Sequence, residues 1–366
     1  MSTKPVAQQH LMSLDLLRGV AALCVVVMHW LDANGSKGFH YSLLAVDFFF
    51  VLSGFVVSYS YRERLRQGMS LAEFMTLRVI RLYPMILVGV VIGVVRFVLK
   101  DHFDPAFARG PIWLFQHALL NVFMVPAFMD GFRADMFILD SALWSLFFEF
   151  LAYLLYALVL HRLSVAVLVA IVMGAGTGVW AWLTDGFSGN PALAGQLFGF
   201  IGYPSGTARV LFSFCLGVLA HELYRRNTVR VGLNGWIAGG ALLGFFALPQ
   251  GATSAELALL VMSLLFPLTV VACAKYSGRL VLPGFAKFLG EISYPIYVVH
   301  APLLWLLEGG LKVAMKASPA GTGLSLIWYG LLFIPLATAL SYALYRTYDL
   351  PVRSGLSAWR RARCGS

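Results

Sequence analysis

Long apolar runs alternate with short polar segments along the whole sequence. Ten runs carry few charges, and most are close to the roughly twenty residues that a helix needs to cross a bilayer. We therefore expect an all-α, polytopic transmembrane helix bundle, forming a single membrane-embedded domain without a fused soluble domain. The predicted spans are residues 15–33, 43–61, 82–99, 143–160, 164–183, 206–222, 234–248, 255–274, 288–307 and 325–346.

A further apolar segment, residues 112–128, contains polar side chains and is ambiguous. If it does not cross the membrane, twelve of the lysines and arginines that follow it lie on one side, and only Arg133, Arg209, Lys312 and Lys316 lie on the other. Basic residues favour the cytoplasmic side. We therefore predict that residues 112–128 form a re-entrant or interfacial helix and that both termini are cytoplasmic, in a multi-pass protein of the cell (inner) membrane.

Composition supports a membrane protein. Hydrophobic residues make up 60% of the chain and charged residues 12%, with a mean hydropathy of +0.79, whereas about a quarter of the residues of a soluble domain are charged. The net charge is +10, and the lysine and arginine residues occur in short clusters between the apolar runs. This pattern indicates that the positive charge orients the protein in the lipid bilayer, and no nucleic-acid partner is expected. The four cysteines are scattered, so neither a metal site nor a disulfide framework is predicted.

The first span carries two polar side chains, Arg18 and His29. Their eleven-residue separation places them within about 20° of the same helix face and about 16 Å apart along the axis. A polar face at two depths is typical of a functional cavity. The alternative is that Arg18 reaches one interface and His29 the other.

Two acidic residues stand in the outer halves of other predicted spans. Asp47 lies at a depth comparable with His29 and either orients that imidazole or caps its own helix. Glu149 lies about one and a half turns inside the membrane, where an isolated carboxylate costs about 3 kcal/mol or more, so it requires a partner. Trp144 is most simply an interfacial anchor, and the Ser53-Gly54 pair favours close helix packing over chemistry.

Arg78 and Arg81 stand three residues apart at the inner mouth of the third span. On a helix they point to one side and can bind a multiply charged anion such as a nucleotide phosphate. The alternative is that they serve only to orient the protein, because basic residues are favoured at the cytoplasmic ends of membrane spans. In the ninth span, Tyr297 precedes a second intramembrane histidine, His300, on a helix that contains Pro295. A kinked helix with such groups suits a polar cavity.

Together these stretches resemble the acyltransferase 3 family of integral membrane acyltransferases. The match extends over nearly the whole chain, and only the last motif departs mildly from the family, which often has Glu-x-Pro there. The motifs are Arg18-x10-His29, Asp47-Phe-Phe-Phe-Val-Leu-Ser53-Gly54-Phe, Arg78-x-x-Arg81-Leu-Tyr83-Pro84, Trp144-Ser145-Leu-x-x-Glu149, Ser293-Tyr294-Pro295-Ile-Tyr297-Val-Val-His300 and Tyr348-Asp349-Leu350-Pro351.

The resemblance implies transfer of an acyl group, commonly acetyl, from cytoplasmic acyl-coenzyme A to a hydroxyl of a carbohydrate, cell-surface glycan or lipid-linked acceptor. Arg78 and Arg81 are then expected to bind the coenzyme A phosphates, and His29 to act as general base, with a transient acyl-histidine as the less favoured route.

The remaining roles follow from the same resemblance. Arg18 would line the thioester channel and Glu149 would orient catalytic groups, with Asp47, Trp144, Ser145, Tyr297 and His300 in support. The rival hypothesis is a proton-coupled transporter or flippase of envelope precursors, which also needs polar groups inside a helix bundle.

Overall fold

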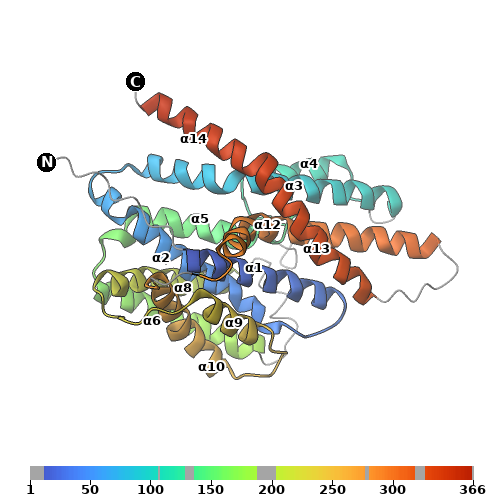
Figure 1. Ribbon diagram of the computed structural model, residues 1–366. Helices are drawn as coiled ribbons and strands as arrows, with labels where there is room; N and C mark the ends of the chain where they lie inside the picture. The colour runs from blue at the N-terminus through green and yellow to red at the C-terminus, as the bar shows by residue number, and fades with distance from the viewer. Residues whose placement is uncertain are drawn as a thin grey trace.

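The computed structural model describes residues 12–105, 108–127, 136–187, 203–276, 280–317 and 326–364. Every regular element in these ranges is helical, which confirms the predicted all-α class (Figure 1). The elements are α1 (Met12–Ala33), η1 (His40–Leu44), α2 (Ala45–Arg66), α3 (Leu71–Phe103), α4 (Pro111–Val122), α5 (Leu143–Leu158), η4 (Leu160–Arg162), α6 (Val165–Phe187), α8 (Tyr203–Arg225), α9 (Gly235–Phe246), α10 (Ala255–Leu260), η7 (Val261–Leu265), α11 (Phe266–Ala274), α12 (Pro283–Ala317), α13 (Leu326–Leu344), η8 (Tyr345–Asp349) and α14 (Leu350–Cys364).

Six helices in the described ranges are long and apolar enough to cross a membrane: Met12–Ala33, His40–Arg66, Leu71–Phe103, Val165–Thr184, Ser205–Arg225 and Ala255–Ala274. Each of the ten predicted spans coincides with helical structure in its described part. However, α5 and α9 are shorter apolar helices, and the 12 residues of α9 reach only about 18 Å. The count of ten spans therefore stays a prediction.

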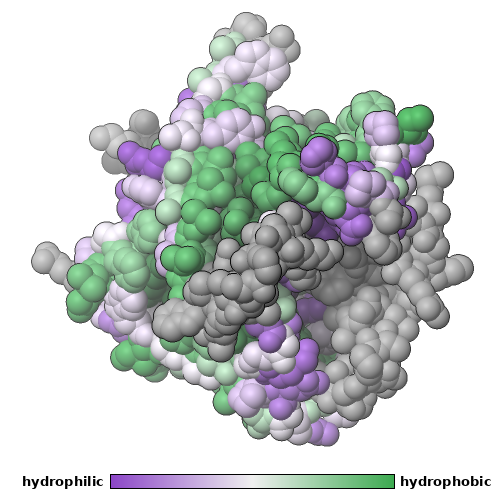
Figure 2. All heavy atoms as spheres, turned by 90° about the vertical axis from the view of Figure 1, so that its right-hand side faces the viewer, coloured by the Kyte–Doolittle hydropathy of each residue, from purple (hydrophilic) through white to green (hydrophobic). Residues whose placement is uncertain are grey.

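Large apolar side chains remain exposed on the outside of the bundle, among them Val91, Ile112 and Leu332. Figure 2 shows apolar residues over much of the upper part of one face, with hydrophilic residues in separate patches. In a soluble protein such an apolar surface would be costly. A lipid bilayer accepts it, so the surface agrees with the membrane assignment.

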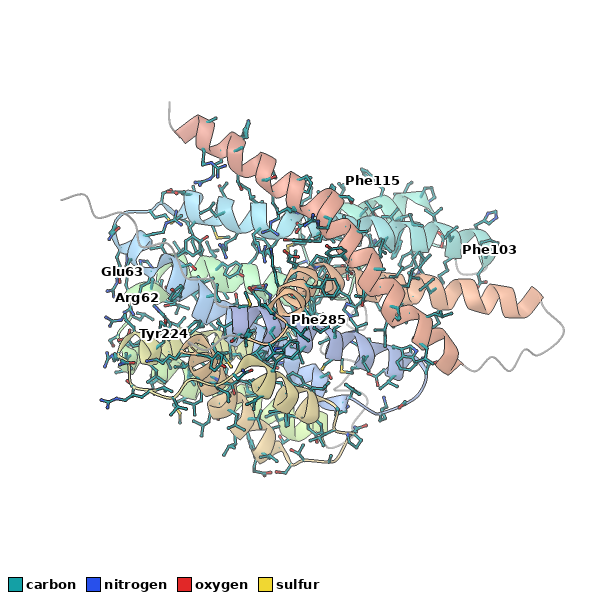
Figure 3. The ribbon with its side chains drawn as sticks, in the orientation of Figure 1. Arg62, Glu63, Phe103, Phe115, Tyr224 and Phe285 are labelled. Carbon is teal, nitrogen blue, oxygen red and sulfur yellow. The ribbon has the colours of Figure 1, made fainter. Side chains whose placement is uncertain are left out.

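One end of the bundle is rich in arginine, and we call it the basic end. Arg62, Arg225 and Arg226 surround the buried carboxylate of Glu222 there, at 2.5, 2.7 and 2.6 Å. Figure 3 shows Arg62 at this end of α2, whereas Phe103, where α3 ends, lies at the opposite end of the molecule. The basic end and the end of α3 therefore lie on opposite sides of the molecule.

Two helix pairs approach closely through glycine. On α2, a Cβ atom at Gly54 would collide with the backbone of Phe214 in α8, and one at Gly217 of α8 would collide with the backbone of Val51. On α1, Gly19 lies in the same way against the backbone of Leu289 in α12. Small residues let membrane helices pack this closely, which confirms the packing role predicted for Gly54.

Helix α4 packs beside the second half of α3 (Figure 1). Trp113 lies against Phe97, with ring centroids 5.3 Å apart, and the Tyr83 hydroxyl donates to the carbonyl of Val122 at the end of α4. Helix α4 therefore runs alongside α3, from the second half of α3 back toward the middle of α3. With 12 residues, α4 is about 18 Å long and too short to cross a bilayer alone.

Helices α3 and α5 run antiparallel. Phe74, early in α3, contacts Tyr153, late in α5, with ring centroids 6.3 Å apart. Asp140, just before α5, lies against Gly89 in the second half of α3. No net crossing is needed between the two helices, and this geometry supports the prediction that residues 112–128 re-enter on the same side.

We expect cysteine labelling to verify this topology. Ser36, Gln67 and Thr228 are exposed, and each can be replaced by cysteine in a Cys364→Ser background, where the remaining cysteines are buried. An impermeant thiol reagent should label Ser36→Cys on intact cells, and Gln67→Cys and Thr228→Cys only after permeabilisation. External labelling of both Ser36→Cys and Thr228→Cys would instead place a net crossing between α3 and α5.

Candidate active site

A cavity of about 450 Å³ lies between α1, α2, α3, α5 and α12. Along α2 it extends from Ser60, near the basic end, to Val46, near the opposite end. These residues are fourteen positions apart, or about 21 Å of helix. The predicted site residues that line it are Arg18, Arg78, Arg81, Ser145, Glu149 and Tyr297.

Arg18 lines the cavity and is held in place by three partners. Its guanidinium donates to the Asp15 carboxylate at 2.9 Å, to the Ser293 hydroxyl at 2.9 Å and to the Gly290 carbonyl at 3.2 Å. Two of these partners belong to α12, so Arg18 joins α1 to α12 across the cavity. Its charge is paired, and it lines the cavity as the sequence predicted.

Arg78 and Arg81 line the cavity toward the basic end. Arg78 donates to the Tyr61 hydroxyl and lies 4.6 Å over the centre of that ring and 5.6 Å over the Tyr153 ring. Its Nε is buried without a hydrogen-bond partner. Arg81 makes no hydrogen bond or ion pair with any other residue in the described ranges. Two neighbouring arginines thus face the cavity without a close carboxylate partner in the described ranges, although Asp349 attracts Arg81 electrostatically from a greater distance. This arrangement is suited to a bound anion.

Glu149 is stabilised by hydroxyl groups rather than by a cation. Its Oε1 accepts a hydrogen bond of 2.7 Å from Ser53 and another from Tyr153, which stands one turn further along α5. Two hydrogen bonds compensate a carboxylate inside the bundle. Ser53 lines the cavity and binds Glu149, so it has a polar contact in addition to the close packing that the sequence predicts for the Ser53-Gly54 pair.

At the end of the cavity away from the basic end, Tyr297 and Ser145 meet. Their hydroxyl groups are 2.6 Å apart, and the Phe49 ring packs edge-on against Tyr297, with centroids 5.5 Å apart. Ser145 also donates toward the Ala142 carbonyl at 3.1 Å. A hydroxyl pair therefore forms the polar wall of this end of the cavity.

His29 and His300 form a pair just beyond this wall. Nδ1 of His29 lies 2.8 Å from Nε2 of His300, and the Tyr297 ring lies 5.8 Å from the His300 ring. Neither histidine lines the cavity, whereas Tyr297 does. The predicted general base therefore stands behind Tyr297, rather than on the cavity wall beside Arg18.

Asp47 does not contact His29, so the prediction that it orients this imidazole was wrong. Its carboxylate accepts hydrogen bonds from Arg209 at 2.6 to 3.2 Å and from Ser213 at 3.3 Å. Asp47 lies in the first turn of α2, and the N-cap residue, Leu44, forms no side-chain cap hydrogen bond. The pair is fully enclosed, with Asp47 0% and Arg209 2% exposed. Arg209, which the charge count placed outside the membrane, is therefore a buried structural residue; Arg133 lies outside the described residues.

Trp144 also differs from its predicted place at the interface. It is 6% exposed, and the Arg209 guanidinium lies 5.3 Å from the centre of its ring and 4.1 Å from that of Trp182. Such cation–π contacts stabilise the positive charge of the arginine. Trp144 thus supports the Asp47–Arg209 pair from α5.

Sequence reasoning missed several contributors. Tyr153 stands four residues after Glu149, and this spacing on a helix is a signal for contact. Tyr61 and Arg209 meet their partners across other helices, and no local pattern points to those contacts. Within the described ranges, no group of three or more His, Cys, Asp or Glu side chains is placed to hold a metal ion.

Comparison with known proteins identifies relatives over nearly the whole chain. A family model described as an acyltransferase domain matches residues 12–346. A protein of the picA locus of Rhizobium radiobacter is 38% identical over 86 residues, which cover 23% of this chain and 44% of that protein. The peptidoglycan O-acetyltransferase of Listeria monocytogenes serovar 1/2a is 24% identical over 370 residues, or 95% of this chain and 56% of that protein.

The chain spans about half the length of these curated relatives. No solved structure matches it.

Proposed function

The chain belongs to the acyltransferase 3 family, and from this premise we propose that it transfers an acyl group, acetyl in the first instance, from acyl-coenzyme A to a hydroxyl of a glycan or lipid-linked acceptor. The single observation that carries the proposal is the cavity itself. It begins at arginines without carboxylate partners and ends at a hydroxyl pair next to two histidines.

The basic end of the cavity supports binding of the donor. Coenzyme A carries several phosphate charges, and Arg78 and Arg81 offer guanidinium groups that form no close ion pair with a carboxylate in the described ranges. We assign this end to the cytoplasm, where acyl-coenzyme A is made and where clustered arginines are favoured. Both termini would then be cytoplasmic, in a multi-pass protein of the cell inner membrane.

The length of the cavity supports delivery of the thioester across the bundle. About 21 Å of α2 separates Ser60 from Val46, and the long pantetheine arm of coenzyme A is narrow and flexible. With the phosphates at Arg78 and Arg81, the arm would pass Arg18 and Glu149. The thioester carbonyl would then come to the hydroxyl groups of Ser145 and Tyr297.

His29 would then act as the general base at the far end. Its proposed role is to take the proton from the acceptor hydroxyl while that oxygen bonds to the acyl carbon and the carbon–sulfur bond breaks, releasing the coenzyme A thiolate. His29 is partly exposed, so an acceptor can approach it from the side away from the basic end. The alternative hypothesis, a transporter or flippase, has no support from the family assignment.

Loss of the two cavity arginines should weaken donor binding. In an Arg78→Gln/Arg81→Gln variant, two charge-assisted contacts are removed, each worth about 1.5–3 kcal/mol. We expect the dissociation constant of acetyl-coenzyme A, measured by calorimetry on purified protein, to rise at least about tenfold. Lysine at both positions should restore part of the affinity, because it keeps the charge but not the forked geometry.

The matched control is Arg225→Gln/Arg226→Gln. This variant removes the same charge at the same end of the bundle, from arginines that bind Glu222 and do not line the cavity. Donor affinity should change little. Equal weakening by both variants would show that the effect is one of overall charge, and unchanged affinity in the Arg78→Gln/Arg81→Gln variant would refute the donor site.

Replacement of His29 should abolish transfer while leaving donor binding intact. General-base catalysis contributes on the order of 10²–10⁴ in rate, and glutamine has similar hydrogen-bonding capacity but cannot take up a proton. We expect His29→Gln to lose most acetyl transfer. The assay follows the release of free thiol and the transfer of labelled acetyl. The acceptor is the envelope glycan or lipid whose mass falls by one acyl group in a deletion strain.

His40→Gln serves as the control, because His40 lies at the same end of the bundle and outside the cavity. It should keep near wild-type turnover. If His29→Gln turns over at the wild-type rate, His29 is not the base. A transporter, in contrast, would release no thiol in any variant.

A further inference from the structure

His300 is buried beside His29 and makes no contact with the cavity, so its purpose is not explained by substrate binding. We propose that His300 is a positioning residue that fixes the tautomer of His29, so that Nε2 of His29 is the basic nitrogen presented to the acceptor. The assignment rests on the proposed role of His29 as general base. The tautomer itself follows from the hydrogen-bond geometry of the two rings and from the burial of His300.

The two rings meet through their nitrogen edges. Nδ1 of His29 and Nε2 of His300 are 2.8 Å apart, while the ring centroids are 5.0 Å apart and the ring planes differ by 17°. Because the nitrogens are much closer than the centroids, they point toward each other. One hydrogen therefore lies between them, and either ring can in principle donate it.

The other nitrogen of His300 decides which ring donates. Nδ1 of His300 lies 2.6 Å from the carbonyl oxygen of Tyr297 and 3.1 Å from that of Ile296. A carbonyl oxygen only accepts, so Nδ1 of His300 carries a hydrogen. His300 is 0% exposed, where an unpaired positive charge would be costly. The neutral ring therefore has an unprotonated Nε2.

An unprotonated Nε2 of His300 can only accept, so Nδ1 of His29 must donate. A neutral His29 with its hydrogen on Nδ1 has its lone pair on Nε2, and this is the nitrogen left for the acceptor hydroxyl. When Nε2 takes the proton, the positive charge of His29 is stabilised by the lone pair of His300. The carbonyl of Tyr297 holds His300, so the residue whose side chain lines the cavity also anchors the pair.

Nitrogen-15 NMR on histidine-labelled protein in detergent tests this assignment. The His29 signals are assigned by their loss in His29→Gln. In the wild type we expect the shift of an unprotonated nitrogen at Nε2 and of a protonated one at Nδ1. In His300→Phe, which removes the acceptor, the His29 tautomers should mix, and kcat should fall about tenfold to a hundredfold with the donor KM unchanged.

His300→Gln is the conservative variant, because its side-chain carbonyl can accept from Nδ1 of His29. It should restore the tautomer and most of kcat, which a merely structural role for His300 would not require. A wild-type spectrum with the hydrogen on Nε2 of His29 would overturn the proposal even if His300→Phe fails to fold. So would an unchanged tautomer in folded His300→Phe. The NMR measurement of the tautomer needs no acceptor. Failure of the tautomer assignment is therefore distinguishable from failure of the proposed acyl transfer.

Discussion

Every charge inside this bundle must be paired, hydrogen-bonded or open to water, because an apolar environment penalises an isolated ion. The structure meets this constraint in two ways. Asp47 and Arg209 form an enclosed pair that ties α2 to α8, and removal of either partner would leave a buried charge. Arg78 and Arg81, in contrast, are left without a carboxylate partner in the described ranges, and both line the cavity. The contrast separates structural charges from those available to a ligand.

The same constraint orders the rest of the cavity. Arg18 is paired with Asp15, and Glu149 is stabilised by hydrogen bonds from the hydroxyl groups of Ser53 and Tyr153. The Arg18 contacts tie α1 to α12 and the Glu149 contacts tie α2 to α5, while glycine contacts hold α1 close to α12 and α2 close to α8. The polar groups therefore keep a defined place inside an apolar bundle, and the cavity remains open between them.

Much of this could be predicted from sequence, because apolar periodicity and membrane thickness determine where helices form. Helix positions and the cavity-lining roles of Arg18, Arg78 and Arg81 follow from such local patterns. The partner of Asp47 could not be found in this way, because Arg209 is 162 residues away on another helix. The spacing of Arg18 and His29 fixes their angle on one helix, but it does not show that His29 pairs with His300 of α12 and lies off the cavity wall.

In the proposed reaction the donor enters at the basic end and the acyl group leaves at the other end. This direction of transfer can be tested directly in proteoliposomes, in which the orientation of the protein is established by protease accessibility. Labelled acetyl-coenzyme A is supplied on one side of the membrane and the acceptor on the other. Label should appear on the acceptor only when the donor is on the side of Arg78 and Arg81. Equal transfer with the donor supplied on the side of His29, or transfer only with donor and acceptor on the same side, would contradict the account.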